Sequence, residues 1–337
     1  MNLNGKSVLI TGGTGSLGNA LTKKILESSP NVKRLVIFSR DEQKQFQMGK
    51  IFPDTEYPAM RYFIGDVRDY ERLLRAFQGI DYVIHAAAMK HVPVAEYNPD
   101  ECIKTNVIGA QNVVRASLEQ ESIKSVVALS TDKACSPINL YGATKLVSDK
   151  LFVSANNIKG SSDKRFSVVR YGNVMGSNGS VMPFFIKEKD KKMLPITDER
   201  MTRFNITLEQ GVDMVLFALN NSMGGEILVP KIPSYKILDV AKAISPDSKI
   251  EIVGIRPGEK LHEEMITKSD SVNTLEFKSF FIIKPSSDFF NYNTKLYCKQ
   301  NKIKLLKKIN SNFTYNSLEN KDYLSLSQLR ALIKKYF

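Results

Sequence analysis

A glycine-rich segment near the N-terminus, T-G-G-T-G-S-L-G at residues 11–18, restricts the possible folds more than any other feature of this sequence. The apolar run at residues 6–10 predicts a β-strand, and apolar residues at helical spacing over residues 19–27 predict an α-helix. Between them, glycines allow the backbone to turn tightly and to approach a pyrophosphate, whose charge the helix N-terminus stabilises. The segment therefore predicts a Rossmann-like fold that binds a dinucleotide at its first turn. The expected contacts there are Gly12, Thr14, Gly15, Ser16, Leu17 and Gly18.

The pattern continues along the first half of the chain. Apolar runs at residues 34–39, 60–65, 82–88, 126–129 and 166–170 alternate with helical patterns at 73–77, 102–119 and 141–156. Such alternation is typical of a doubly wound, parallel α/β sheet, so we predict a dinucleotide-binding Rossmann domain at residues 1–175. Residues 176–285 are predicted to form a smaller, loop-rich substrate-binding domain, with a helix at 208–219 that returns to the sheet. The Asn- and Lys-rich residues 286–337 form a C-terminal segment to which the sequence assigns no role.

The ends of the later strands indicate which dinucleotide is bound. The second strand ends in Ser39 and Arg40, with Lys44 shortly after, whereas an acidic residue at its end would select a ribose 2′-hydroxyl. Because a hydroxyl, a guanidinium and an ammonium suit a phosphate, the sequence favours NADP over NAD, although Asp41 and Glu42 follow directly. The remaining expected cofactor contacts are Asp41, Asp66 and Val67 at the adenine end, Ala86, Ala87 and Ala88 at the ribose and nicotinamide, Lys90 in the loop at 89–99, and Tyr141 and Lys145.

The segment S-T-D-K-A-C-S-P-I-N-L-Y-G-A-T-K at residues 130–145 concentrates the reactive side chains. Tyr141 and Lys145 lie four residues apart at the start of a predicted helix, so the phenol and the ammonium share one helix face. Thr131, Asp132 and Lys133 precede them directly after a buried strand. An acid, a base and a phenol with a neighbouring cation predict proton and hydride transfer.

Composition and scattered residue types exclude several other classes. The net charge of +13 accompanies no nucleic-acid-binding module, so we expect no nucleic-acid partner. Three cysteines and three histidines at unrelated spacings predict neither a metal site nor a disulfide framework. The first predicted strand leaves no room for a signal peptide, and no apolar run reaches the length of a membrane span. We therefore expect a cytoplasmic protein without a membrane partner.

Several motifs resemble a known family. The glycine-rich segment, the Tyr141 and Lys145 pair and R-Y-G-N-V at 170–174 resemble the extended short-chain dehydrogenase/reductase superfamily. S-R-D-E-Q-K-Q, A-A-A-M-K-H-V-P-V-A-E-Y-N-P, S-T-D-K-A and I-R-P-G-E-K-L-H-E are similar to the inverting UDP-N-acetylglucosamine 4,6-dehydratases. These lyases open pseudaminic acid synthesis for flagellin and surface glycosylation. The resemblance extends over residues 6–265.

This resemblance implies a mechanism with an internal redox cycle. Tyr141, made more acidic by Lys145, would take the 4-hydroxyl proton while C4 gives a hydride to tightly bound NADP. Lys133 would remove the C5 proton, which requires a lowered pKa that neighbouring Lys90 or Lys145 could supply. Asp132 would protonate the departing 6-hydroxyl, and the hydride would return to C6, leaving a 4-keto-6-deoxy sugar of L-arabino configuration.

The resemblance also implies the substrate contacts and the assembly. The expected UDP-sugar contacts are Lys90, Thr131, Asn173, Arg203, Arg256 and Glu259, with Val181, Met182 and Pro183 at the uracil. The family forms homo-oligomers, as dimers or hexamers. Two alternatives remain open: another nucleotide-sugar 4,6-dehydratase or a 4-epimerase of capsule or O-antigen synthesis, and a catalytically silent NADP sensor. A sensor is disfavoured because Asp132, Lys133, Tyr141 and Lys145 are all present.

Overall fold

The protein is described here by a computed structural model covering residues 2–176, 181–189, 193–286 and 292–337. Among these residues, a ten-stranded sheet has the order β16-β14-β15-β10-β6-β5-β4-β1-β2-β3. The segment from β10 to β3 is parallel, and β15, β14 and β16 extend it as antiparallel strands. The strand bounds are β1 Ser7–Thr11, β2 Arg34–Ser39, β3 Met60–Ile64, β4 Tyr82–His85, β5 Ser125–Thr131, β6 Arg165–Tyr171, β10 Ile227–Pro230, β14 Thr274–Glu276, β15 Phe280–Ile283 and β16 Lys307–Lys308. The predicted Rossmann-like, doubly wound fold is confirmed.

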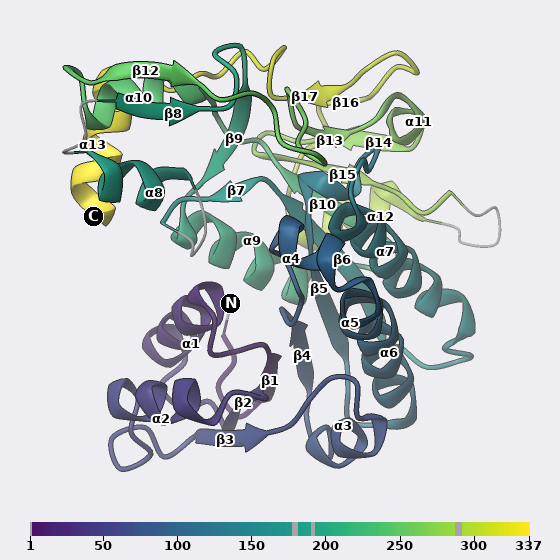
Figure 1. Cartoon of the computed structure of the whole chain (residues 1–337). Coiled ribbons are helices and arrows are strands. Elements are labelled where there is room, and N and C mark those ends of the chain that lie inside the picture. The colour runs from purple at the N-terminus through teal and green to yellow at the C-terminus, as the bar shows by residue number, and fades with distance from the viewer. Residues whose placement is uncertain (1, 177–180, 190–192, 287–291) are drawn as a thin grey trace.

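Helices cover both faces of this sheet (Figure 1). One face is covered by α1 (Ser16–Ser28), α2 (Glu42–Ile51) and α9 (Leu208–Asn221). The other face is covered by α3 (Tyr70–Ala76), α5 (Pro99–Ile103), α6 (Gly109–Glu119) and α7 (Leu140–Ile158). Each helix packs on the sheet because its apolar stripe needs a partner surface. As predicted, α9 returns to the sheet, where it contacts β5 and β6.

Two segments differ from the local predictions. The loop expected at residues 89–99 contains the short helix α4 (Val92–Tyr97), which begins with a proline in its first turn. The helix expected at 102–119 is interrupted by a π-helical turn, η1 (Lys104–Ile108), between α5 and α6. Such turns insert an extra residue and are frequent at functional sites. Here the turn carries Asn106, which is buried.

A smaller unit lies across the carboxyl ends of the parallel strands. It contains β7 (Asn173–Val174), α8 (Val181–Glu188), β8 (Met193–Ile196), β9 (Thr202–Ile206), β11 (Ser234–Lys236), α10 (Ile237–Ile244) and β12 (Lys249–Ile252). Its core is a separate apolar cluster that includes Phe185, Leu194, Tyr235 and Val240. A large concave surface lies between the two cores.

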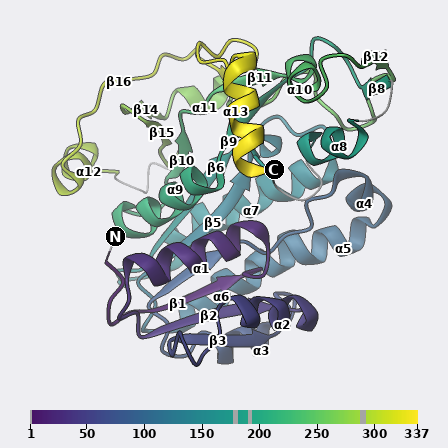
Figure 2. The same cartoon turned by 90° about the vertical axis from the view of Figure 1, so that its left-hand side faces the viewer.

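The C-terminal residues join both units. The strand β17 (Tyr315–Asn316) pairs with β13 (Glu264–Ile266), while β16 extends the large sheet. Two further helices, α11 (Lys268–Ser271) and α12 (Thr294–Asn301), lie between β13 and β17 in the sequence. Figure 2 shows the last helix, α13 (Leu326–Tyr336), beside α10, where its Leu329 is fully buried in the smaller core. The domain boundaries at residues 176 and 286 stay a prediction. Described strands beyond each of these residues contribute to the large sheet.

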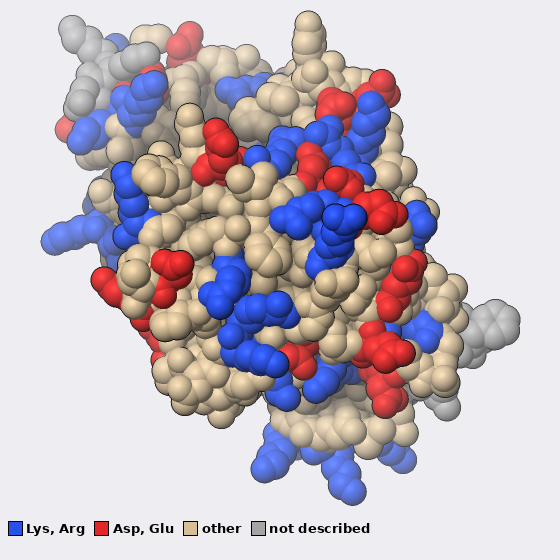
Figure 3. Space-filling view, turned by 90° about the horizontal axis from the view of Figure 1, so that it is seen from below, with Lys and Arg blue, Asp and Glu red and all other residues tan. Residues whose placement is uncertain are grey.

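The surface charge is mixed. On the face shown in Figure 3, lysine and arginine side chains are interspersed with aspartate and glutamate. Among the described helices, none has both the length and the apolar character needed to cross a membrane.

Candidate active site

A cleft of about 1500 Å³ separates the two units. It opens at the carboxyl ends of β1, β4, β5 and β6, and the strand order reverses between β1 and β4. Open α/β sheets bind ligands at such a switch point. All site residues predicted from the sequence line this cleft except Asp132 and Met182.

The glycine-rich segment forms a close-fitting cradle at one end. Gly12 has a φ of +65°, and a Cβ there would lie 2.8 Å from the Ala87 backbone. A Cβ on Gly18 would lie 2.1 Å from the Gly13 carbonyl oxygen. The N-cap of α1, Gly15, contributes no side-chain hydrogen bond to the first turn. The backbone amides of this turn can therefore face an anionic group, which fits the pyrophosphate of a dinucleotide.

The adenosine end of the cleft carries a hydroxyl pair and two cations. Thr14 and Ser39 join their hydroxyl groups at 2.9 Å, and the exposed Arg40 lies 3.8 Å from Asp66. Asp41 caps α2 by accepting from the Lys44 backbone amide at 3.0 Å, and this hydrogen bond lowers its pKa. The other oxygen of Asp41 forms an ion pair with Lys44 Nζ at 3.2 Å, so both cations of this end face a carboxylate.

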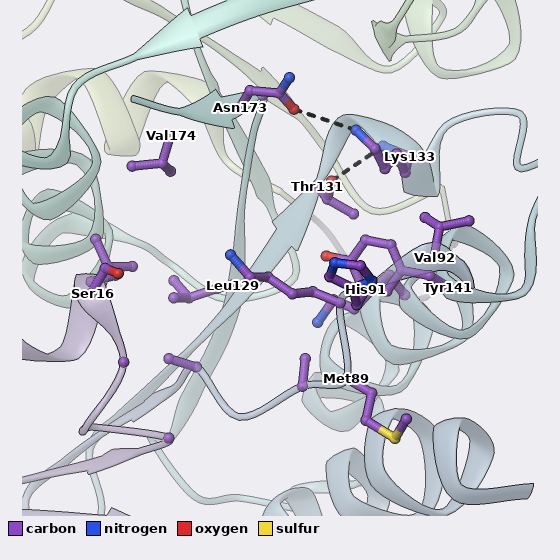
Figure 4. Close-up of a pocket in the computed structure, with 18 of the residues that line it drawn as sticks. Ser16, Met89, His91, Val92, Leu129, Thr131, Lys133, Tyr141, Asn173 and Val174 are labelled. Atoms are coloured by element: carbon purple, nitrogen blue, oxygen red, sulfur yellow. Dashed lines mark hydrogen bonds between the residues drawn. The ribbon is translucent and has the colours of Figure 1, made fainter. Parts of the chain in front are cut away.

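The catalytic segment is built by the transition from β5 to α7. Thr131 ends β5, the short turn η2 (Asp132–Ala134) follows, and Asn139 caps α7 by accepting from the Gly142 amide at 2.7 Å. A Cβ on Gly142 would lie 2.1 Å from the Lys133 carbonyl oxygen, so only glycine lets α7 approach the turn this closely. Asn139 and Gly142 thus bring Tyr141 next to Thr131 and Lys133, as Figure 4 shows.

The ammonium of Lys133 is surrounded by acceptors. Its Nζ lies 3.1 Å from Asp132 Oδ1, 3.1 Å from Glu263 Oε1 and 3.4 Å from Asn173 Oδ1. Burial lowers the pKa of Lys133, but the Asp132 and Glu263 carboxylates outweigh burial and raise that pKa above its usual range. The expectation of a lowered pKa is therefore wrong. Lys90, the proposed source of that lowering, instead has its own pKa lowered by burial and by Lys133.

Asp132 occupies a different place from the one expected. It is fully buried and does not line the cleft. Its Oδ1 accepts from the Thr131 hydroxyl at 2.9 Å and from Lys133 Nζ, whereas Oδ2 has no hydrogen-bond partner among the described residues. Burial raises the pKa of this carboxyl group, against the effect of Lys133. Asp132 can therefore hold a proton but reaches the cleft only through Thr131 or Lys133, which do line it.

Tyr141 and Lys145 lie side by side on α7, both nearly buried and both lining the cleft. Burial raises the pKa of Tyr141 to about 12, and Lys133 together with the Thr131 hydroxyl acts in the opposite sense. Lys133 is therefore one cation that favours the phenolate, and the expected role of Lys145 stays a prediction. Burial lowers the pKa of Lys145 itself.

The other wall of the cleft comes from the smaller unit. Asn173, Val181, Pro183, Arg203, Arg256 and Glu259 line it, as expected from the sequence. The expectation that Met182 lines the cleft is wrong. Met182 is buried in the smaller core, because consecutive residues of α8 point about 100° apart. The guanidinium of Arg203 is largely held by the protein itself, since Nη1 donates to the Thr202 carbonyl oxygen at 2.7 Å and to that of Leu261 at 3.2 Å.

Two further residues shape the site without having been predicted. Asn106, in the π-helical turn, donates to the Met89 carbonyl oxygen at 2.9 Å and accepts from the Met89 amide at 2.8 Å, which fixes the loop that carries Lys90. Glu263 contacts Lys133 from the segment that leads into β13. The π-helical turn has no sequence signal that we can identify, whereas Glu263 is the last residue of the motif I-R-P-G-E-K-L-H-E at residues 255–263.

A family model described as "Polysaccharide biosynthesis protein" matches residues 8–285. The chain belongs to this family. It is 54% identical to the UDP-N-acetylglucosamine 4,6-dehydratase (inverting) of Campylobacter jejuni subsp. jejuni serotype O:2, over 98% of each chain. It is 40% identical to the UDP-glucose 4-epimerase of Rickettsia conorii, over 92% of each. These relatives and the family model confirm the resemblance expected from the sequence motifs.

A solved structure supports the same grouping. The X-ray structure of Pen from Bacillus thuringiensis is 38% identical, with a TM-score of 0.87 over 99% of this chain and 98% of that one. The superposition covers both units, so the cleft between them belongs to the shared fold.

Proposed function

We propose that this chain is a C5-inverting UDP-N-acetylglucosamine 4,6-dehydratase. The observation that carries the proposal is Lys133 beside Tyr141 in the cleft, paired with the buried Asp132 behind it, in a chain 54% identical to a dehydratase of this type. An oxidation at C4 needs only a base beside the 4-hydroxyl, whereas elimination of water across C5 and C6 also needs a second base and an acid. This chain offers all three groups within one segment.

The cofactor proposed is NADP, held tightly and regenerated in each turnover. The glycine cradle fits its pyrophosphate, and Ser39, Arg40 and Lys44 fit its 2′-phosphate. Lys145 suits the ribose hydroxyls, because it is nearly buried and lines the cleft wall. When bound, the cofactor would supply the hydride acceptor for C4 and the hydride donor for C6.

The protein's own groups would move the protons. Tyr141 takes the proton of the 4-hydroxyl group, and Thr131 donates a hydrogen bond near C4. The resulting ketone acidifies the C5 proton, which Lys133 removes. Asp132 supplies the proton with which the 6-hydroxyl leaves as water, and it does so through Thr131 or Lys133 because it is itself buried. Asn173, Arg203, Arg256 and Glu259 hold the nucleotide, and Lys90 contacts the sugar or a phosphate.

The physiological setting is part of the proposal. The product would be UDP-2-acetamido-2,6-dideoxy-β-L-arabino-hexos-4-ulose, used in the cytoplasm for pseudaminic acid synthesis and flagellin or surface glycosylation. We propose that the chain works as a homo-oligomer, a dimer or a hexamer. The inverting UDP-N-acetylglucosamine 4,6-dehydratase relatives support the substrate and the reaction in this proposal.

The purified protein should convert UDP-N-acetylglucosamine to a 4-keto-6-deoxy product without added cofactor. The reason is that the hydride taken from C4 is returned to C6, so bound NADP is not consumed. The measurement is product formation by mass spectrometry together with absorbance at the NADPH band. Stoichiometric consumption of added NADPH would reject the internal cycle.

A 4-epimerase is the second candidate, favoured by the 40% identity to the Rickettsia conorii enzyme. The same assay separates the two, because an epimerase retains the mass of the substrate whereas a dehydratase releases water. Formation of UDP-N-acetylgalactosamine as the sole product would establish the epimerase.

Arg40→Asp should weaken NADP binding about 10–100-fold while changing NAD binding much less, because a charge-assisted hydrogen bond contributes about 1.5–3 kcal/mol. Calorimetric titration of both cofactors measures this. Lys50→Asp is the matched control, since this substitution changes the charge by the same amount. Lys50 lies in the last turn of α2 and does not line the cleft. An unchanged preference in Arg40→Asp would exclude Arg40 as a 2′-phosphate ligand.

A further inference from the structure

Each N–H donor of the Lys133 ammonium has an acceptor within reach. An ammonium has three N–H donors and no lone pair, and Lys133 Nζ faces three acceptors, on Asp132, Glu263 and Asn173. Lys133 can act as a base only after it has lost one proton, so one of these contacts must take part in the release.

Unlike the fully buried Asp132, Glu263 reaches the wall of the cleft. It is 2% exposed, its backbone amide donates to the Ser317 hydroxyl at 2.9 Å, and its Oε2 has no hydrogen-bond partner among the described residues. Its charge is balanced by Lys133 and, at 3.7 Å, by Arg203 Nε. Burial acts to raise the pKa of Glu263, but these two cations outweigh it and lower that pKa. A buried carboxylate is costly unless it is paired, so Glu263 and Lys133 hold each other in place.

We propose that Glu263 is a positioning residue for the dehydration: it holds the Lys133 ammonium at the cleft wall until the excess proton passes to Asp132. The reaction step rests on the proposed function, whereas the hold on Lys133 does not. The proposal assigns Glu263 no contact with substrate or cofactor.

The proton balance is as follows. One proton moves from Lys133 Nζ to Asp132 Oδ1 across the 3.1 Å contact, which converts an ammonium and a carboxylate into an amine and a carboxylic acid. The amine then forms a bond to the C5 proton as the C5–H bond breaks, and the acid gives its proton through the Thr131 hydroxyl to O6 as the C6–O bond breaks. The pair thus regains its starting charges, and Glu263 stays ionised throughout. Glu263 favours the ammonium at the start and at the end of this sequence.

The direction of the effect follows from all charged and titratable groups near Lys133. Asp132 and Glu263 raise its pKa, and Arg203 on β9 lowers it. Lys90 beside β4, Tyr141 on α7 and Tyr235 on β11 also sense the charge of Lys133. Removing the Glu263 charge should therefore lower the pKa of Lys133, and each unit of this shift raises the neutral fraction about tenfold below that pKa.

The test is Glu263→Gln in the full-length protein with its retained cofactor. Acetic anhydride reacts only with the neutral amine, and mass spectrometry of the Lys133 peptide reports its labelling rate at pH 8. The rate should rise about 10–1000-fold, as expected for loss of a neighbouring opposite charge worth about 1–3 pKa units. The control is Glu264→Gln, because Glu264 is the adjacent carboxylate and bonds Ser136 instead. An unchanged Lys133 rate in Glu263→Gln overturns the proposal.

A second variant protects the test against a folding defect. Arg203→Gln removes a cation that opposes protonation of Lys133, so its labelling rate should fall, and a rise would contradict the proposal. The kinetic readout is exchange of the C5 proton in D₂O as a function of pH. In Glu263→Gln the acidic limb should move to lower pH, and Glu263→Asp, which keeps the charge, should restore it towards the wild-type position.

The outcomes separate the two proposals. A raised labelling rate with an unmoved pH profile would show that Glu263 holds Lys133 but has no part in the reaction. A wild-type protein without dehydratase activity would reject the proposed function, while the labelling rates would still decide whether Glu263 holds Lys133.

Discussion

Replacing Lys133 by alanine should slow exchange of the substrate's C5 proton with solvent by about 10²–10⁴-fold, the usual contribution of a general base. Cofactor and nucleotide binding should persist, because Gly12, Gly18 and Arg256 lie elsewhere in the cleft. Oxidation at C4 uses Tyr141 as its base, so reduced cofactor should still form on the protein, although more slowly because Lys133 no longer favours the phenolate. The measurements are deuterium incorporation at C5 by NMR and absorbance of the reduced nicotinamide.

Lys133→Arg is the matched variant for charge. Its guanidinium can still face Asp132 and Glu263 but cannot be deprotonated in a protein, so it too should lose C5 exchange. Because it keeps the buried carboxylates paired, its thermal unfolding should stay closer to wild type than that of the alanine variant. Undiminished exchange in either variant would remove Lys133 from the role of base.

Replacing Tyr141 by phenylalanine should lower kcat by about 10²–10⁴-fold and should stop the reaction before C4 is oxidised. The phenol oxygen is lost while the ring keeps its packing against Ala95 and Cys102 in the same small cluster. The measurement is formation of reduced cofactor after mixing with UDP-N-acetylglucosamine, which should be absent here but present in Lys133→Ala.

Tyr171→Phe is the control for this change. Tyr171 is also nearly buried and lines the same cleft from β6, and burial likewise raises its pKa, but it does not belong to the catalytic segment. It should keep most of the activity. Equal losses in the two variants would indicate a general effect of removing a buried phenol rather than a role for Tyr141.

Local sequence patterns predicted the larger part of the fold. The glycine-rich segment and the alternation of strands with helices predicted where the strands lie along the chain and that they are parallel, because both signals act over a few neighbouring residues. The packing of α13 on α10 was not predicted, since the contact joins segments far apart in the chain and the sequence of α13 does not name its partner. For the same reason the sequence did not place β16 at the edge of the large sheet.

The sequence predicted which residues form the site better than it predicted their charges and pKa shifts. Nearly all expected residues line the cleft, because they follow parallel strands whose carboxyl ends meet at one edge. The pKa of Lys133 was predicted in the wrong direction, since its charge depends on Glu263, which is distant in sequence. Asp132 was placed at the substrate, whereas the turn η2 directs its side chain into the interior. A position in a motif indicates residue type and neighbourhood but not which way a side chain points.

The most direct test of the proposed dehydration is NMR of the product formed from UDP-N-acetylglucosamine in D₂O. We predict a 6-methyl signal, a C4 in the keto or hydrated keto state, deuterium at C5 and coupling constants of the L-arabino configuration. A product that retains an oxygen at C6, or one that keeps its original C5 proton, would contradict the elimination that we assign to Lys133 and Asp132.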